Sequence, residues 1–370
     1  MKLLILSVSA GGGHINAAEA IKAHAELYLP DLDVEIIDTI KYINPFLDKL
    51  IIGSYLKSIK LYPSIFGMLY NYAETDDGLA TVSSKFNELM ANKIIPLIDD
   101  FNPDIIISTH PFSTEMLSIL KSKMKIKKPV ISVLTDYAPH SFWIHPNIDA
   151  YVVATEEMAK DMAIRGVNPS QVFSFGIPVH PDFLVNKDRD DFFKELELDP
   201  NKLTLLLMGG SLGMGNILEV YSQLSKISMD FQIIAITGNN KKLLNALNEA
   251  TENSDKPTKI VGFTKNVNSY MKCSDLLITK PGGLTVSEAL ISNLPLAIFS
   301  AIPGQEEKNA EFLLKHNLAI DLGKGNDCEY KIQDLLIDNN KLDLMKNNCK
   351  HFSKPNAGKN IIELIKNMTQ

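Results

Sequence analysis

The chain reads Thr-Lys-Pro-Gly-Gly-Leu-Thr-Val-Ser-Glu-Ala-Leu at residues 279–290, directly after a short, mainly apolar run at 274–279. The apolar run predicts a buried strand, and the pattern that follows predicts a helix beginning at Gly282 and Gly283. Glycines let a ligand approach the backbone closely, and the free N–H groups at a helix start attract phosphate. Glu288, roughly a turn and a half into this helix, offers a carboxylate suited to both hydroxyls of a ribose. The stretch therefore predicts a nucleotide site in an α/β domain.

Short β-branched runs alternate with helical patterns along the rest of the chain, which predicts parallel sheets flanked by helices. The expected strands are 2–8, 34–38, 105–109, 130–135, 151–154 and 172–175, then 203–208, 232–237, 259–261, 276–279, 296–299 and 319–322. A length of 370 residues exceeds what one hydrophobic core usually serves. We therefore expect two doubly wound domains in series, joined by a linker at 175–181 that is rich in glycine and proline.

Composition and charge argue against several classes of protein. The net charge of −7 argues against strong non-specific nucleic-acid binding. The three cysteines show neither a disulfide framework nor a zinc pattern, which fits a reducing cytoplasm. The first ten residues are interpreted as a buried strand running into a glycine loop rather than as a signal peptide. No apolar run approaches the ~20 residues that span a bilayer, so any work on lipids is expected from the membrane surface.

In each of the two expected domains, a glycine-rich loop follows the first strand. Residues 9–14 read Ser-Ala-Gly-Gly-Gly-His; a dinucleotide site is the alternative here, because Asp38 ends the next strand, but contiguous glycines and a histidine fit it poorly. His14 instead suits a neutral imidazole that takes a proton from an acceptor hydroxyl. Residues 208–215 lack the Lys-Ser/Thr of a P-loop, and we expect them to receive a departing diphosphate. A tight turn is the structural alternative.

Two further loops, 108–112 and 135–143, follow strands of the first domain, where ligands of open α/β sheets gather. They contribute His110, Asp136, His140 and the single tryptophan, Trp143. We expect these side chains near an acceptor; an Asp-turn and a core tryptophan are the structural alternatives. The histidines lack the helical spacing of metal ligands, and no metal is expected.

The segment 45–91 interrupts the alternation and is rich in aromatic and aliphatic residues. It suits either an amphipathic membrane-docking element or a pair of ordinary helices packed on the sheet. Residues 121–128 place five lysines in an otherwise acidic protein. Paired with that segment, they suggest an anionic membrane surface as a partner, and a solvated helix end is the alternative.

Taken in order, these residues resemble the monogalactosyldiacylglycerol synthases and processive diacylglycerol glucosyltransferases, glycolipid synthases of the GT-B, family 28 type. In the first domain the resemblance rests on 9–14 with Ala17 and Ala18, His110 with Pro111, Thr135 and Asp136 with Trp143, and 176–179. In the second it rests on 209–211, 262–264, 280–290 and 303–307 followed by Asn309. Each glycine loop alone is weak evidence, whereas the ordered set is specific and covers nearly the whole chain.

The resemblance implies a GT-B fold of two Rossmann-like domains facing an interdomain cleft. Residues 1–177 would form the acceptor and membrane-side domain, with a C-terminal helix in 350–370 packing back on it, and 178–349 would bind the UDP-sugar. The implied catalytic residues are His14, as base, and Asp136. The implied acceptor-binding residues are Gly13, His110 and Trp143. The implied donor-binding residues are Gly209, Gly210, Ser211, Gly262, Phe263, Thr264, Lys280, Gly282, Gly283, Thr285, Glu288, Gln305, Glu306 and Asn309.

Among these, Glu288 would bind the ribose, Gln305 and Glu306 the sugar hydroxyls, and residues 209–211 the diphosphate. Phe263 would lie at the uracil. The implied reaction is inverting transfer of a hexose from a UDP-sugar to diacylglycerol or a glycosyl-diacylglycerol, without a cofactor or metal, at the cytoplasmic face of the membrane. The alternatives are transfer to a polyprenyl-linked acceptor, UDP-N-acetylglucosamine 2-epimerisation, and a non-catalytic UDP-sugar sensor.

Overall fold

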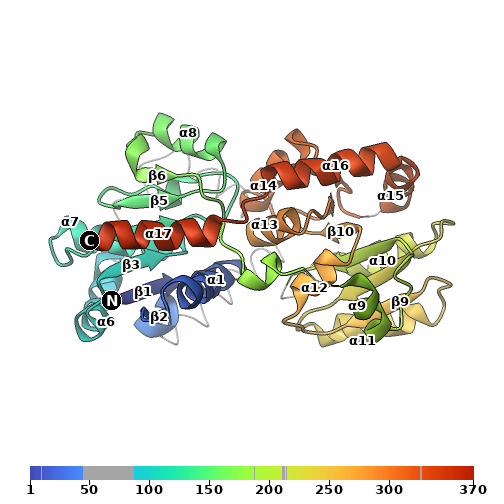
Figure 1. Cartoon of the computed structure of the whole chain (residues 1–370), viewed down its shortest axis with the longest axis horizontal. Coiled ribbons are helices and arrows are strands. Elements are labelled where there is room, and N and C mark those ends of the chain that lie inside the picture. The colour runs from blue at the N-terminus through green and yellow to red at the C-terminus, as the bar shows by residue number, and fades with distance from the viewer. Residues whose placement is uncertain (10, 45–86, 187, 211–212, 214, 326) are drawn as a thin grey trace. The chain divides into compact units, whose positions relative to one another are not determined.

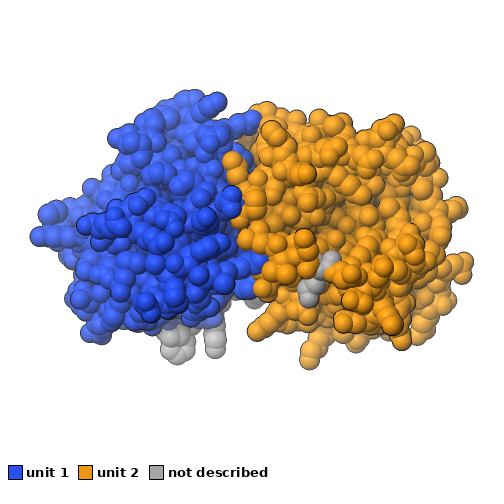
Figure 2. Space-filling model, in the orientation of Figure 1, with its two compact units in different colours: residues 1–181, 302–305, 356–370 blue, residues 182–301, 306–355 orange. Residues whose placement is uncertain are grey.

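A computed structural model describes residues 1–9, 11–44, 87–186, 188–210, 213, 215–325 and 327–370. Within them the chain divides into two compact units (Figure 2). Unit 1 comprises 1–181, 302–305 and 356–370, and unit 2 comprises 182–301 and 306–355. Most of the segment 45–91, together with Ser211, lies outside the described residues, so the expectations placed on them stay untested.

Unit 1 is built on a six-stranded parallel sheet in the order β2-β1-β3-β4-β5-β6 (Figure 1). Its strands are β1 (Lys2–Ser7), β2 (Asp33–Asp38), β3 (Ile105–Ser108), β4 (Val130–Val133), β5 (Ala150–Val152) and β6 (Val172–Phe173). Its helices are α1 (Gly13–Tyr28), α2 (Thr39–Ile43), α6 (Ile95–Phe101), α7 (Pro111–Ser122), α8 (Glu156–Ile164) and α17 (Ala357–Thr369), with the short 3-10 helices η2 (Ser141–Trp143) and η3 (Pro169–Gln171). The apolar runs form the central strands because both faces of a parallel sheet are buried.

Unit 2 repeats the plan with a six-stranded parallel sheet in the order β12-β11-β10-β7-β8-β9. Its strands are β7 (Thr204–Met208), β8 (Gln232–Ile236), β9 (Thr258–Val261), β10 (Leu276–Thr279), β11 (Leu296–Ile298) and β12 (Ala319–Asp321). Its helices are α9 (Arg189–Leu196), α10 (Ile217–Ser225), α11 (Lys241–Thr251), α12 (Val267–Lys272), α13 (Gly283–Ile291), α14 (Gln305–Lys315), α15 (Cys328–Ile337) and α16 (Asn339–Phe352), after the 3-10 helix η4 (Pro181–Leu184). The prediction of two doubly wound α/β domains is confirmed, and every expected strand overlaps an observed one.

Helix α17 belongs to unit 1 although unit 2 precedes it in the sequence. Its apolar face, which includes Ile361, Ile362 and Ile365, is buried in the same core as Leu3 of β1 and Ile105 of β3. The helix therefore completes the core of the unit in which the chain begins.

Each sheet has one topological switch point, where the strand order reverses. In unit 1 it lies between β1 and β3, and in unit 2 between β7 and β10. Connections on the two sides of such a point run to opposite faces, which leaves a crevice at the carboxyl ends of the two strands. The glycine loops at 9–14 and 209–215 and the turn at 280–283 all follow these strands.

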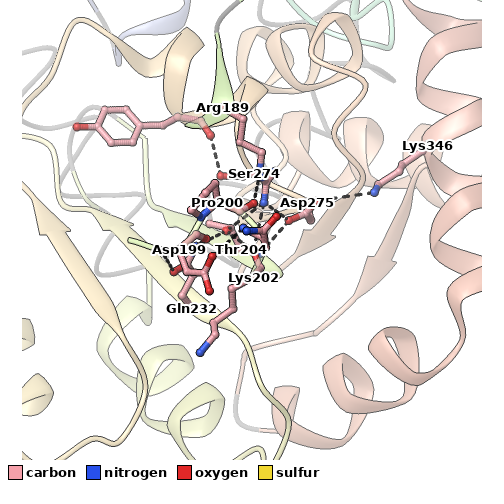
Figure 3. Close-up of polar contacts among 11 residues, drawn as sticks. Arg189, Asp199, Pro200, Lys202, Thr204, Gln232, Ser274, Asp275 and Lys346 are labelled. Atoms are coloured by element: carbon pink, nitrogen blue, oxygen red, sulfur yellow. Dashed lines mark hydrogen bonds and ion pairs between the residues drawn. The ribbon is translucent and has the colours of Figure 1, made fainter. Parts of the chain in front are cut away.

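The opposite, amino edge of the unit 2 sheet is closed by a polar network around Arg189 (Figure 3). Its Nε donates to Pro200 O at 2.9 Å, and its Nη2 donates to Lys202 O at 3.2 Å and to Asp275 Oδ2 at 2.9 Å. Asp275 Oδ2 also accepts from Thr204 N at 2.9 Å, at the start of β7. These bonds satisfy the polar groups where α9, β7 and β10 begin.

Candidate active site

His14 is the second residue of α1 and lies at the switch point of unit 1. Its Nδ1 lies 3.0 Å from Thr109 O and 2.8 Å from Thr135 Oγ1. Because a carbonyl oxygen can only accept, the hydrogen-bond pattern assigns the proton to Nδ1 and leaves the lone pair on Nε2. The ring is thereby held by its neighbours in the tautomer that a general base acting through Nε2 requires.

Burial lowers the pKa of His14 to about 4, although its hydrogen bond to Thr109 O acts in the opposite direction. The desolvated site disfavours the charged imidazolium. At neutral pH the ring is therefore neutral and able to accept a proton.

His110 lies beside this base, with ring centroids 4.5 Å apart and an interplanar angle of 73°. It caps α7, and its Nδ1 accepts from Phe112 N at 3.1 Å, which places the ring proton on Nε2. Burial, and then the neighbouring His14, keep the pKa of His110 well below its usual range. The site thus pairs two neutral imidazoles in opposite tautomers, one with an accepting Nε2 and one with a donating Nε2.

The loop after β4 supplies the remaining unit 1 residues. Trp143 is buried with its ring centroid 6.3 Å from that of His14, and Asp136 is also buried. Gln305 belongs to unit 1 with 302–305, and its Nε2 donates to Asp136 Oδ2 at 2.5 Å. Thr135 contacts His14 directly, a role that the sequence does not assign to it; its place just after a strand, at the carboxyl edge of the sheet, is the signal that indicates it.

In unit 2 the turn after β10 leads into α13, whose N-cap is Gly282. No side chain caps this helix start, so first-turn N–H groups, among them those of Gly283 and Thr285, are placed to meet an anion. Across the switch point, Gly210 has φ +69°, and a Cβ added there would meet no atom within 4 Å. Backbone conformation and open space at this edge thus suit a close-lying phosphate.

Two polar contacts tie α14 to the same turn. Lys280 Nζ lies 3.1 Å from Glu306 Oε1 and 3.0 Å from Oε2. Asn309, fully buried one turn later, donates from Nδ2 to Pro281 O at 3.0 Å. The start of α14 is therefore fixed beside the turn that opens α13.

Glu288 is half-buried in α13, and burial raises its pKa to about 8. The loop after β9 ends at the same carboxyl edge of the sheet, where the Phe263 ring is exposed and Gly262 has no atom within 4 Å of an added Cβ. Thr264 Oγ1 accepts from Asn266 N at 3.1 Å, which shapes this loop. One edge of the sheet thus offers three kinds of group that suit the parts of a nucleotide. An aromatic ring suits a base, a carboxyl group suits a ribose, and helix-start N–H groups suit a diphosphate.

Comparison with known proteins identifies the family. Residues 14–179 match the monogalactosyldiacylglycerol (MGDG) synthase family, and residues 204–367 match the glycosyltransferase family 28 C-terminal domain. The processive diacylglycerol beta-glucosyltransferase of Bacillus subtilis (strain 168) is 30% identical over 369 residues, covering 98% of this chain and 94% of that protein. The chain belongs to this family of glycolipid glycosyltransferases. Its namesake from Bacillus pumilus is 29% identical over 372 residues, with 98% and 94% covered.

Solved structures show that the glycosyltransferase has the GT-B fold. MurG of Acinetobacter baumannii superposes with a TM-score of 0.65 at 14% identity, covering 99% of both chains. UDP-GlcNAc 2-epimerase from Neisseria meningitidis, bound to UDP-GlcNAc, gives 0.63 at 14% identity, covering 99% of this chain and 100% of that one. At such identities the likeness extends to the fold alone.

Three of the five lysines in residues 121–128 contact acidic or polar side chains of the protein. Lys121 pairs with Asp149, Lys123 pairs with Glu88, and Lys125 Nζ donates to Asn92 Oδ1 at 2.5 Å. In the described part of the chain no helix is both long and apolar enough to cross a membrane. The same residues contain no group of three or more histidine, cysteine, aspartate or glutamate side chains placed to hold a metal ion.

Proposed function

We propose that this glycosyltransferase moves a hexose from a UDP-hexose to diacylglycerol or a glycosyl-diacylglycerol, with inversion, to give a β-glycolipid. The observation that carries the proposal is the match, over nearly the full length of both proteins, to processive diacylglycerol beta-glucosyltransferases. Those names favour glucose as the sugar. The enzyme would act as a peripheral protein on the cytoplasmic, anionic face of the membrane, because its acceptor is a membrane lipid.

We assign donor binding to the carboxyl edge of the unit 2 sheet. Glu288 binds the ribose hydroxyls, and the exposed ring of Phe263 stacks on uracil, with the backbone of Gly262 and Thr264 beside it. Gln305 and Glu306 bind the hexose hydroxyls. The residues assigned to the diphosphate and its surroundings are Gly209, Gly210, Ser211, Lys280, Gly282, Gly283, Thr285 and Asn309.

We assign the acceptor hydroxyl to the two histidines at the unit 1 switch point. The hydroxyl gives its proton to His14 Nε2 as its oxygen bonds to the anomeric carbon. The bond from that carbon to the β-phosphate oxygen breaks, and its electron pair leaves with UDP. His110, Gly13 and Trp143 line the acceptor's path, and Asp136 takes part in arranging the reacting groups. Helix-start N–H groups offset the charge on the departing UDP, so the proposed reaction needs no metal.

The test is release of UDP from UDP-glucose and from UDP-galactose, with and without diacylglycerol in anionic liposomes. We expect turnover that depends on diacylglycerol and is faster with UDP-glucose. Turnover with a polyprenyl-linked sugar but not with diacylglycerol would show that the acceptor is the polyprenyl-linked sugar. UDP-sugar binding without transfer to either lipid would overturn the proposal in favour of epimerisation or sensing.

The raised pKa of Glu288 predicts that UDP binding depends on pH. With a pKa of about 8, the free carboxyl group is mostly protonated at pH 7. The ribose hydroxyls favour the carboxylate, so binding at pH 7 should release a proton, and affinity should rise as pH rises toward 8. Calorimetry in buffers of different ionisation enthalpy measures this release. Glu288→Gln should abolish it, and undiminished release from that variant would contradict the assignment.

A further inference from the structure

Lys280 and Glu306 form a sequestered ion pair in the proposed donor site. The ammonium contacts both carboxylate oxygens, at 3.1 and 3.0 Å, and the two side chains are only 11% and 17% exposed. A second pair on α14, Lys308 with Glu311, has a similar distance of 2.9 Å but exposures of 51% and 64%. Water screens the second pair, whereas the first places two largely desolvated charges where an anionic ligand is expected.

Lys280 lies beside both backbone segments that we assign to the diphosphate, the glycine loop after β7 and the turn that opens α13. It is the first residue after β10, and Gly282 and Gly283 follow it at the start of α13. A Cβ added to Gly215 would lie 3.7 Å from Lys280 Cδ, so the lysine stem runs beside the glycine loop that follows β7. The ammonium thus belongs to the same switch point as the two segments.

Glu306 is held at this point by its own helix. The first turn of α14 is fixed by the bond from buried Asn309 to Pro281 O, next to Lys280 in the chain. The backbone of α14 is thereby fixed beside Lys280, so a change of partner by the Glu306 carboxylate requires rotation of its side chain.

We propose that binding of the UDP-hexose divides this ion pair: Lys280 turns to the diphosphate, and Glu306 accepts hydrogen bonds from the hexose hydroxyls. The inference rests on the proposed function. Each charge exchanges one partner for another, so the loss of the ion pair is offset at both side chains. When the bond to the anomeric carbon breaks, the electron pair moves onto the β-phosphate oxygen, and Lys280 is the cation that offsets that charge.

The exchange makes the site discriminate between substrate and product. UDP without its hexose attracts Lys280 away from Glu306 but offers the carboxylate no hydroxyl groups in exchange, so the loss of the ion pair is not offset. Binding of UDP alone is thereby weakened relative to UDP-hexose. After transfer, Lys280 returns to Glu306 and UDP leaves.

The test is to measure by calorimetry the affinities of the wild-type enzyme and of single and double variants for UDP and for UDP-glucose. Glu306→Gln frees Lys280 and should tighten UDP binding about tenfold, while reducing the advantage of UDP-glucose over UDP. Lys280→Met should weaken UDP binding about 10- to 100-fold, the range of one charge-assisted hydrogen bond. In the charge-free Lys280→Met/Glu306→Gln variant, the glutamine should no longer tighten UDP. Glu311→Gln, which breaks the exposed pair on the same helix, should leave both affinities unchanged.

Unchanged or weaker UDP binding by folded Glu306→Gln would overturn the exchange, as would unchanged UDP binding by Lys280→Met. Tightening of UDP by the glutamine in the absence of Lys280 would overturn it too. Failure of the wild-type enzyme to bind UDP would instead overturn the donor site and the exchange with it. If the wild-type enzyme binds UDP but the variants do not change UDP affinity, the exchange alone would be overturned. The double variant covers the case in which Lys280→Met does not fold, because it leaves no unpaired charge.

Discussion

Replacing His14 by alanine is expected to lower kcat for glycolipid synthesis by about 10²- to 10⁴-fold, the usual contribution of a general base. The reason is the tautomer set by Thr109 O and Thr135 Oγ1, which leaves Nε2 free to accept a proton. The measurement is initial rate of glycolipid formation at saturating UDP-glucose and diacylglycerol. UDP affinity should be unchanged, because His14 belongs to unit 1 and the donor residues of the β7–β10 switch point belong to unit 2.

Two controls separate a base from a structural histidine. Thr135→Val removes one of the two Nδ1 partners and leaves Thr109 O, so it should lower kcat by about tenfold or less, the value of one hydrogen bond. The acceptor's kcat/KM at saturating donor should persist as pH falls through 6.5 and be lost only toward about 4, where His14 becomes protonated. Full activity of His14→Ala, or an acid limb that the variant retains, would remove His14 from the mechanism.

Replacing Gly358 by alanine is expected to destabilise unit 1 by about 2–5 kcal/mol, the sum of overpacking and a broken buried hydrogen bond. An added Cβ would lie 2.1 Å from Cδ2 and 2.3 Å from Nε2 of His24, which is buried in α1. The ring cannot yield freely, because Nε2 donates to Val179 O at 3.0 Å. Chemical denaturation followed by circular dichroism measures the loss.

A second substitution tests the cause. His24→Ala destabilises the unit by its own cavity, but it also makes room for the methyl group of Ala at 358. The double variant should therefore be more stable than the sum of the two losses implies. Gly262→Ala is the matched control for stability, because no atom lies within 4 Å of its added Cβ. Strictly additive losses in the double variant would show that His24 is not the obstacle.

Sequence predicted the two sheets well because a parallel strand buried on both faces is a short continuous apolar run, such as Leu276–Thr279. It also predicted that the glycine loops and His14 follow strands, at the carboxyl ends of those strands. The roles assigned to the site residues stay predictions. The contacts that refine the site could not be predicted, since they depend on side-chain geometry between distant residues. Lys280 and Glu306 are 26 residues apart, and Thr135 reaches His14 across 121.

The placement of α17 in unit 1 has a consequence for how the protein is made. The ribosome delivers the strands of unit 1 first, but Ile361, Ile362 and Ile365, which cover part of their core, are synthesised after all of unit 2. Until then, apolar surface around Leu3 and Ile105 lacks its native cover and is open to chaperones or to misassociation. All of unit 2 is synthesised before α17, so we expect the unit that is translated first to be the last to reach its native state.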